Sequence, residues 1–204
     1  MFKVGLCGGI ASGKSTISRI FESLGVSIVD TDLISHELMQ PGQVGYQKTL
    51  DHFGPEILLP NAAINRNRLR ELVFNDPDLK RWLEQMLHPL IKDEAIKLMQ
   101  EISNTPYVLL VVPLMFETGF NQLVDHVIAI DCPRSVQITR LIQRDGINEK
   151  LANQILDAQI NNEERIRLAD SIISNSENSD PSEQISTLHH KLILLSTHLA
   201  SKAE

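Results

Sequence analysis

A glycine-rich octapeptide near the start of the chain constrains the fold more than any other feature of this sequence. Residues 8–15 read GGIASGKS and match the pattern GxxxxGK[ST]. An apolar run ends directly before them at Cys7, and residues 15–24 carry apolar side chains at helical spacing. A strand, a glycine-rich turn and a helix in this order form a phosphate-binding loop. The sequence therefore predicts an α/β nucleotide-binding fold, against the alternative of a plain strand-to-helix turn.

The residue types of this loop suit ATP with Mg²⁺. Glycines let the backbone N–H groups point at phosphate oxygens, and the dipole of the following helix favours negative charge. Lys14 would reach the β- and γ-phosphates as a catalytic cation, and the Ser15 hydroxyl would ligate the metal. The expected ATP-binding residues of the loop are Gly8, Gly9, Ala11, Ser12, Gly13, Lys14, Ser15 and Thr16.

Five short apolar runs predict a parallel sheet. They are rich in Val, Ile and Leu, and several are apolar almost without interruption, which is typical of strands covered on both faces. They comprise residues 3–7, 26–29, 107–112, 124–130 and 170–173. Together with the helix between the first two runs, they predict a P-loop NTPase core with three α/β/α layers around a five-stranded parallel sheet.

Two long helical stretches between the strands predict additional parts. Residues 33–104 are too many for a simple crossover and contain breaks such as Pro41-Gly42 and His88-Pro89, so we expect a separate helical lobe. Residues 135–168 form a second, arginine-rich stretch, and residues 182–200 form a last helix after a turn-like segment at 176–182. We predict a nucleotide-binding core at 1–32, 105–139 and 169–204, a helical substrate domain at 33–104 and a lid at 140–168.

Two carboxylates follow the second predicted strand. Asp30 and Asp32 lie at its carboxyl end, which is the edge of an open α/β sheet where ligands bind. One of them would orient or deprotonate an attacking hydroxyl group. The structural alternative is that Asp32 only caps a helix that begins at Leu33.

Arginines supply the remaining candidate phosphate contacts. Arg140 and Arg144 are four residues apart and so share one helix face, from which they would clamp ATP when the lid closes. A solvated surface face is the alternative. A smaller basic cluster comprises Arg66, Arg68 and Arg70, and it would meet an anionic substrate. The alternative is that half of these residues are plain surface.

Composition narrows the classes of partner. The 204 residues carry a formal net charge of −7, which disfavours a non-specific grip on nucleic acid. No apolar run approaches the roughly 20 residues that span a bilayer, and the first residues lack the layout of a signal peptide. We therefore expect a cytoplasmic protein with no membrane or nucleic-acid partner. Cys7 and Cys132 lack metal-ligand spacing and are expected to be small core residues.

Two weaker patterns are interpreted as structural. Residues 51–54 match the DxxG of GTPases, but they follow a helix-like segment, and the chain has no NKxD motif. The histidines show no HxxxH or HExxH spacing, which disfavours a histidine-based metal site. His189, His190 and His198 fall in the last predicted helix and are expected to face solvent.

Taken together, these motifs make the chain resemble the dephospho-coenzyme A kinase family over nearly its whole length. The resemblance rests on the Gly8 to Ser15 loop, Asp30-Thr31-Asp32, Phe53-Gly54, Asn65-Arg66 with Leu69 and Val73-Phe74, His88-Pro89-Leu90-Ile91, Pro113-Leu114-Met115-Phe116-Glu117, Gln137 with Arg140 and Arg144-Asp145, Gln159, and Ala169-Asp170 with Asn175. The family transfers the γ-phosphoryl group of ATP to the ribose 3′-hydroxyl of dephospho-CoA. It has a P-loop core, a helical domain for the CoA portion and a mobile lid.

The resemblance implies roles for single residues. Asp32 takes the position of the carboxylate beside the attacking hydroxyl, and Arg140 belongs to the nucleotide clamp. The implied substrate-binding set is Asp30, Asp32, Arg66 and His88. The chain departs from the family in that Ala11 stands where Gly is common, Asn65 stands where Asp is frequent, and no Walker-B Asp follows the third predicted strand.

Two other functions remain open on the sequence. The first is another small-molecule P-loop kinase, which would act on a nucleoside monophosphate or a sugar acid. The second is a nucleotide-dependent switch that hydrolyses slowly, although the absent NKxD motif counts against it. The long helical stretch at 33–104 favours a large acceptor.

Overall fold

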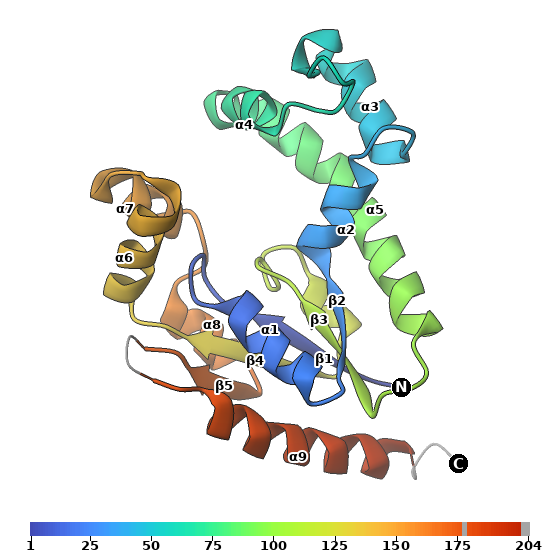
Figure 1. Cartoon of the computed structure of the whole chain (residues 1–204), viewed down its shortest axis with the longest axis vertical. Coiled ribbons are helices and arrows are strands. Elements are labelled where there is room, and N and C mark those ends of the chain that lie inside the picture. The colour runs from blue at the N-terminus through green and yellow to red at the C-terminus, as the bar shows by residue number, and fades with distance from the viewer. Residues whose placement is uncertain (177–178, 201–204) are drawn as a thin grey trace. The chain divides into compact units, whose positions relative to one another are not determined.

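The computed structural model describes residues 1–176 and 179–200. Residues 177–178 of the expected turn, residues 201–204 of the expected core, and the side chains of residues 199–200 lie outside that description. The chain forms two compact units (Figure 1). The core unit comprises Met1–Val29 and Met99–Glu204, and the helical unit comprises Asp30–Leu98.

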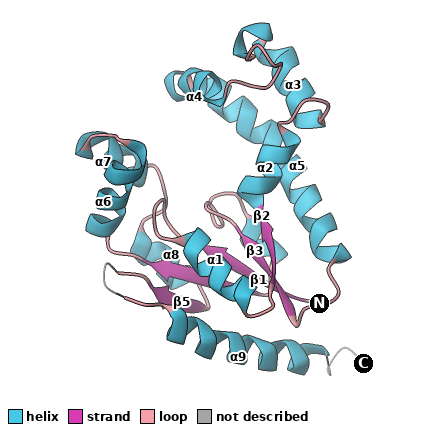
Figure 2. Ribbon diagram, viewed as in Figure 1, coloured by secondary structure: helices cyan, strands magenta, loops and turns pink. Residues whose placement is uncertain are grey.

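A five-stranded sheet is the centre of the core unit (Figure 2). The strands follow the spatial order β2-β3-β1-β4-β5, with bounds Ser27–Asp30, Tyr107–Val111, Phe2–Cys7, His126–Asp131 and Ser171–Ser174. β1 pairs in parallel with β3 and with β4, and β4 pairs in parallel with β5. The central strands are almost entirely buried, because helices and loops cover both faces. The predicted parallel sheet is confirmed.

Alternation along the strands defines the two faces of this sheet. Leu6, Leu109 and Ile128 pack with side chains of α1 (Lys14–Ser23) and α9 (Ser182–Ala200) in the main hydrophobic core. The following residue in each strand points to the opposite face. There Asp131 of β4 accepts a hydrogen bond from Asn162, the first residue of α8 (Asn162–Leu168). The sheet therefore lies between helices, as the three-layer prediction requires.

Three helices follow β4 in the stretch that contains the predicted lid. α6 spans Arg134–Asp145 and α7 spans Glu149–Asp157, and both precede α8. Leu141, Ala152 and Leu156 form a small apolar cluster, against which Ile10 and Ala11 of the phosphate loop pack. The loop tip thus contacts these helices through apolar side chains as well as through hydrogen bonds.

The helical unit has its own apolar core. It contains α2 (Thr31–Leu38), α3 (Val44–Phe53), the short 3₁₀ helix η1 (Pro55–Ile57), α4 (Arg66–Asn75) and most of α5 (Pro77–Glu101). The buried members of the core are Met39, Tyr46, Phe53, Ile57, Ile64 and Leu69. Asp51-His52-Phe53 lies in helix, which agrees with a structural reading of the DxxG match.

The expectation for one histidine is wrong. His189 is buried, and its Nδ1 lies 2.9 Å from the Tyr107 hydroxyl oxygen on β3. Burial lowers the pKa of His189, and the neighbouring His190 lowers it further. His190 and His198 are exposed as expected. Helical periodicity explains the difference, because His189 lies four residues after the buried Ile185 and so on the same face.

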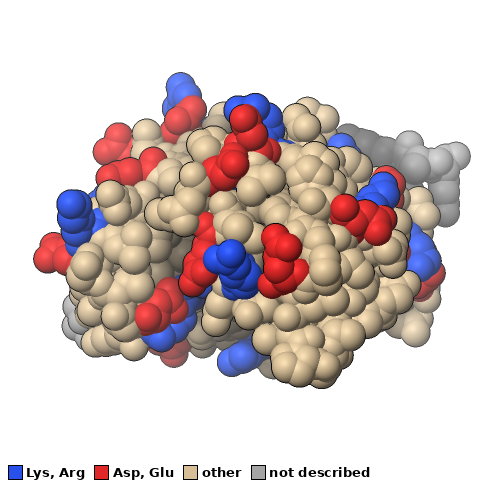
Figure 3. Space-filling view, turned by 90° about the horizontal axis from the view of Figure 1, so that it is seen from above, with Lys and Arg blue, Asp and Glu red and all other residues tan. Residues whose placement is uncertain are grey.

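Charged side chains of both signs are interspersed on the face shown in Figure 3. Within the described ranges, no helix is long and apolar enough to cross a membrane.

Candidate functional site: a phosphate-binding loop

The glycine-rich loop connects β1 to α1 and depends on left-handed backbone at two positions. Gly13, which precedes α1, has φ of 96°. Ala11 has φ of 57°, a conformation that costs a residue with a side chain about 1 kcal/mol or more. Ala11, which stands where the family commonly has Gly, thus adopts a left-handed conformation that favours glycine.

Glycines in the loop allow other groups to approach closely. A Cβ atom on Gly8 would lie 2.5 Å from the Ser12 Oγ, and one on Gly9 would lie 2.5 Å from the Gln137 Nε2. At Gly13 the added Cβ would collide with the Asn175 amide. A side chain at any of these positions would therefore collide with the side chains that pack against the loop.

Three side chains, two from α6 and one from the segment directly after β5, hold the carbonyl groups of the loop. The Gln137 Nε2 donates to the Ile10 carbonyl at 2.7 Å, the Arg140 Nη1 to the Ala11 carbonyl at 3.3 Å, and the Asn175 Nδ2 to the Ser12 carbonyl at 2.7 Å. In a trans peptide unit the N–H points opposite to the C=O. These contacts therefore direct the N–H groups of Ala11, Ser12 and Gly13 away from the three side chains that hold the carbonyl groups.

Lys14 and Ser12 place further polar groups at the loop. The Lys14 Nζ donates to the carbonyl of Gly8 at 2.7 Å and to that of Gly9 at 3.2 Å, so the ammonium group lies against the start of the loop. The Ser12 Oγ is buried and has no hydrogen-bond partner among the described residues. A buried, unsatisfied hydroxyl beside a glycine cradle fits an anionic ligand such as a phosphate.

The residues present also suit Mg²⁺ that arrives with a nucleotide. Ser15 is exposed in the first turn of α1, one residue after Lys14. In the described part of the chain, no cluster of three His, Cys, Asp or Glu side chains could hold a metal ion. Mg²⁺ commonly takes most of its ligands from substrate phosphates and water, so a single serine hydroxyl next to bound phosphates is a fitting protein ligand.

The two clamp arginines occupy different surroundings. Arg140 contacts the loop at Ala11, and the same Nη1 lies 3.7 Å from the Cys132 Sγ. Arg144 instead makes a two-pronged ion pair with Asp145, with contacts of 2.7 and 2.8 Å, and its side chain is more than half exposed. This hydrogen bond with Asp145 raises the pKa of Arg144. The structure thus brings Arg140 to the loop and leaves Arg144 at the surface.

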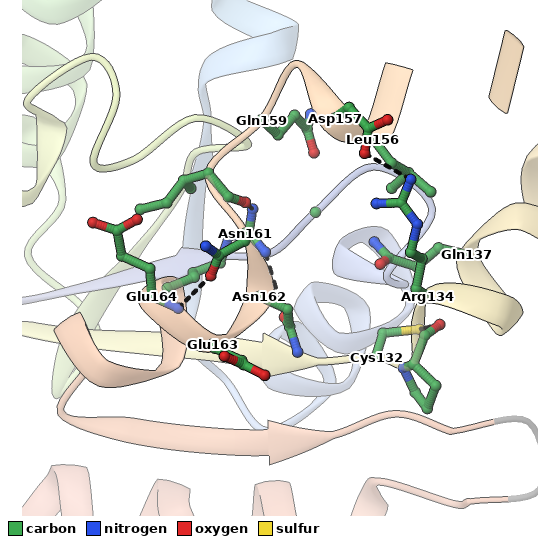
Figure 4. Close-up of a pocket in the computed structure, with 14 residues that line it drawn as sticks. Cys132, Arg134, Gln137, Leu156, Asp157, Gln159, Asn161, Asn162, Glu163 and Glu164 are labelled. Carbon is green, nitrogen blue, oxygen red and sulfur yellow. Dashed lines mark hydrogen bonds and ion pairs between the residues drawn. The ribbon is translucent and has the colours of Figure 1, made fainter. Parts of the chain in front are cut away.

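A pocket of about 740 Å³ opens beside the loop (Figure 4). Gly9 and Gln137 line it together with residues of the α7–α8 connection, among them Gln159 and Asn161. The Gln159 Oε1 accepts a hydrogen bond from the Ile10 N–H at 2.9 Å. Both polar groups of Ile10 are therefore held by glutamine side chains, one from α6 and one from the α7–α8 connection.

Arg165 is a lining residue that our sequence analysis did not single out. It lies in α8 and is only 3% exposed. The local sequence NNEERIRL reads as a charged helix with two similar arginines, and no local signal tells the buried one from the exposed Arg167.

The predicted acceptor-side residues lie in the helical unit. Asp30 precedes α2, and its Oδ1 accepts from the Asp32 N–H at 2.8 Å, so Asp30 is the N-cap. Asp32 is exposed in the first turn. The alternative in which Asp32 caps a helix that begins at Leu33 is wrong, because α2 begins at Thr31 and Asp30 caps it. Arg66 is exposed at the start of α4, and His88 is half-buried in α5.

Asn65 explains one departure from the family pattern. Its Oδ1 accepts a hydrogen bond from the Arg68 N–H at 3.1 Å and so caps α4. Asn and Asp are about equally good at this position. The asparagine therefore preserves the start of the helix that carries Arg66.

Both cysteines are buried, as expected. Burial raises the pKa of the Cys7 thiol to about 12, although Arg165 and Lys14 oppose this shift. Burial also raises the pKa of Cys132, against the effect of Arg140. A thiol with a raised pKa is a poor nucleophile at neutral pH, so the two cysteines serve packing.

The sheet and the loop between β1 and α1 place the chain in the class of P-loop kinases. A shikimate kinase from Bacteroides thetaiotaomicron shares the fold, with a TM-score of 0.55 and 16% identity, over 94% of this chain and 98% of that one.

Within this class, the chain belongs to the dephospho-CoA kinase family. The model of the Dephospho-CoA kinase family matches residues 2–180. A curated dephospho-CoA kinase from Nitrosospira multiformis is 41% identical over 197 residues, which cover 96% of this chain and 98% of the relative. The solved structure of a dephospho-CoA kinase from Campylobacter jejuni is 30% identical, with a TM-score of 0.69, over 93% of this chain and 96% of that one.

Proposed function

We propose that the chain transfers the γ-phosphoryl group of ATP to the ribose 3′-hydroxyl of dephospho-CoA, giving CoA and ADP. This reaction is the last step of CoA biosynthesis. The observation that carries the proposal is the match of residues 2–180 to the dephospho-CoA kinase family. The anchored loop supports it, because its glycine cradle, Lys14 and the buried Ser12 hydroxyl provide the phosphate site that the reaction needs.

The loop and its neighbours serve the ATP side of the reaction. Lys14 contacts the β- and γ-phosphates and stabilises the charge that develops on the transferred group. Ser15 would hold Mg²⁺, which neutralises phosphate charge when bound. Arg140 is already at the loop and clamps the nucleotide. Arg144 joins it only when the lid at 140–168 closes, because it must first leave Asp145.

The helical unit serves the acceptor side. Asp32 orients the 3′-hydroxyl and takes its proton late, since a loose transition state needs an aligned nucleophile more than a fully deprotonated one. Its exposed position in the first turn of α2, where Asp30 and not Asp32 supplies the cap, supports this role. Asp30, Arg66 and His88 complete the substrate-binding set, within a substrate domain at 33–104. A cytoplasmic location belongs to the same proposal.

An acceptor panel tests this function. ADP production from ATP with Mg²⁺ is followed with dephospho-CoA, AMP, adenosine or no acceptor. We expect ADP to form rapidly only with dephospho-CoA and only when Mg²⁺ is present. Preference for AMP or adenosine would favour another small-molecule kinase, and equal ADP production without any acceptor would favour a nucleotide-dependent switch.

A further inference from the structure

Arg165 is a buried cation whose hydrogen-bond partners are neutral. Its Nη2 donates to the Ile160 carbonyl at 2.8 Å, and its Nη1 donates to the Asn162 Oδ1 at 3.4 Å. None of the ion pairs among residues 1–176 and 179–200 includes it, whereas the exposed Arg134 and Arg167 are paired with Asp157 and Glu164. Burying a guanidinium without a carboxylate is costly unless another anion compensates the charge.

The position of Arg165 identifies that anion as a phosphate. The Nη1 lies 3.5 Å from where a Cβ on Gly9 would be, and the Gln137 Nε2 lies 2.5 Å from the same point, so both groups approach the loop at Gly9. The carbonyl of the same Gly9 accepts a hydrogen bond from Lys14. Gly9 and Arg165 both line the 740 Å³ pocket. Two cations therefore approach the start of the loop from separate helices, α1 and α8.

The chemistry of the pocket agrees with this identification. Besides Arg165, the charged side chains in the lining are Arg134, Asp157, Glu163 and Glu164, and all four are exposed. Figure 4 shows the ion pair between Arg134 and Asp157, in which the Arg134 Nη2 lies 2.8 Å from the Asp157 Oδ1. Arg165 and Lys14 oppose the rise in the pKa of the buried Cys7, whereas Glu117 adds to it. Among the charged side chains that line the pocket, Arg165 is thus the buried one.

We propose that Arg165 is a catalytic residue, whose guanidinium contacts the γ-phosphoryl group of ATP beside Gly9 and stabilises its charge during transfer. We assign the contact of Arg165 to the γ-phosphate because Lys14, the P-loop lysine, reaches the β- and γ-phosphates. Lys14 also donates a hydrogen bond to the carbonyl of Gly9, beside which Arg165 lies. The proposal rests on the function proposed above for the use of ATP.

The role of Arg165 in the step is electrostatic. A bond forms between the acceptor oxygen and the γ-phosphorus, and the bond from the γ-phosphorus to the β–γ bridging oxygen breaks. ADP leaves with that electron pair, and the proton of the acceptor hydroxyl goes to Asp32. Arg165 stays protonated throughout and neutralises charge on the equatorial oxygens, a contribution of about 10³- to 10⁵-fold in kcat where arginine does this in other phosphoryl transferases.

A purely structural role is the alternative, in which Arg165 only holds the α7–α8 connection through the Ile160 carbonyl. The two roles differ in their dependence on the γ-phosphate. Loss of a contact with the γ-phosphate would weaken the binding of ATP and leave the binding of ADP unchanged. Distortion of the α7–α8 connection would instead weaken the binding of both nucleotides, because Gln159 would no longer hold the loop. The test therefore measures Kd for ADP and for a non-hydrolysable ATP analogue by calorimetry, beside kcat and the melting temperature.

The variants are Arg165→Lys, Arg165→Ala and the matched control Arg167→Gln, which lies two residues further along α8 and is exposed. We expect Arg165→Ala to lose at least about 100-fold in kcat and to regain part of it with added guanidinium at a non-denaturing concentration. We expect Arg165→Lys to weaken binding of the ATP analogue about tenfold, because an ammonium group cannot form the bidentate contact with phosphate that a guanidinium group can. ADP binding should stay within about twofold, and Arg167→Gln should behave like the parent protein.

Equal loss of ADP and ATP-analogue affinity in Arg165→Lys would overturn the proposal, and so would a folded Arg165→Ala variant with normal kcat. If Arg165→Ala does not fold, the ratio of the ADP affinity to the ATP-analogue affinity in Arg165→Lys still decides between the phosphate contact and the structural role. Because nucleotide binding needs no acceptor, this result is independent of whether dephospho-CoA is the substrate.

Discussion

Replacing Gln137 with methionine removes one hydrogen bond from the tip of the phosphate-binding loop. The side chain is 5% exposed, and its Nε2 donates to the Ile10 carbonyl at 2.7 Å. Methionine has a similar volume and enough flexibility to fill the same space, but it has no donor. The variant therefore isolates the contribution of this contact.

The size of the effect follows from the burial of the two groups. A neutral hydrogen bond contributes about 0.5–1.5 kcal/mol, and a buried acceptor left without a donor costs about 1–3 kcal/mol. Since the Ile10 carbonyl is partly buried, we expect Gln137→Met to lower the free energy of unfolding by about 1–2 kcal/mol, which is about 2–8 °C in Tm for a chain of this size. ATP affinity should fall about tenfold, because the Ile10 peptide can rotate out of its binding orientation.

Thermal unfolding and calorimetric titration with an ATP analogue measure both effects. Gln143→Met is the matched control, because Gln143 lies on the same helix and is exposed. We expect this control to stay within about 0.5 kcal/mol of the parent protein. Identical melting temperatures and ATP affinities for Gln137→Met and Gln143→Met would refute the view that Gln137 anchors the loop.

Three other predictions follow from the site and the core. Lys14→Ala should lower kcat about 100-fold or more in a folded protein, measured by steady-state kinetics, because the transferred group loses a fixed cation. Asp30→Ala should lower the free energy of unfolding by about 1 kcal/mol in urea titrations because a cap is lost, whereas Asp32→Asn should lower kcat by about 10² to 10⁴ with unchanged stability. Burial lowers the pKa of both His126 and His189 from its ordinary value of 6.5. The two histidines therefore bind protons more readily in the unfolded chain than in the folded one. Tm should be highest above pH 6.5 and should fall as the pH drops below that value. A Tm that is independent of pH between about 6.5 and 5 would contradict this prediction.

The sheet and the loop could be predicted because their signals are local. Buried parallel strands read as short, continuous apolar runs, and four of the five predicted runs differ from the observed strands by at most one residue at each end. The run at 124–130 begins two residues early, because Val124 and Asp125 precede β4. The loop needs only eight consecutive residues, whose types and order are set by the phosphate that they surround.

Contacts between distant residues explain what the sequence did not reveal. The sequence left capping by Asp32 open as an alternative, because both aspartates are good caps, and only the observed hydrogen bond assigns the cap to Asp30. His189 lies on the apolar face of α9, but its partner Tyr107 is 82 residues away. Arg165 became notable only when the fold buried it beside Gly9.

The fate of the γ-phosphate tests the central claim most directly. ATP that carries a radioactive γ-phosphate is incubated with Mg²⁺, dephospho-CoA and the protein, and the labelled products are separated. We predict that the label appears in the 3′-phosphate of CoA in a one-to-one ratio with the ADP formed. Label recovered as inorganic phosphate, with dephospho-CoA unchanged, would contradict the assignment of this chain as a kinase of dephospho-CoA.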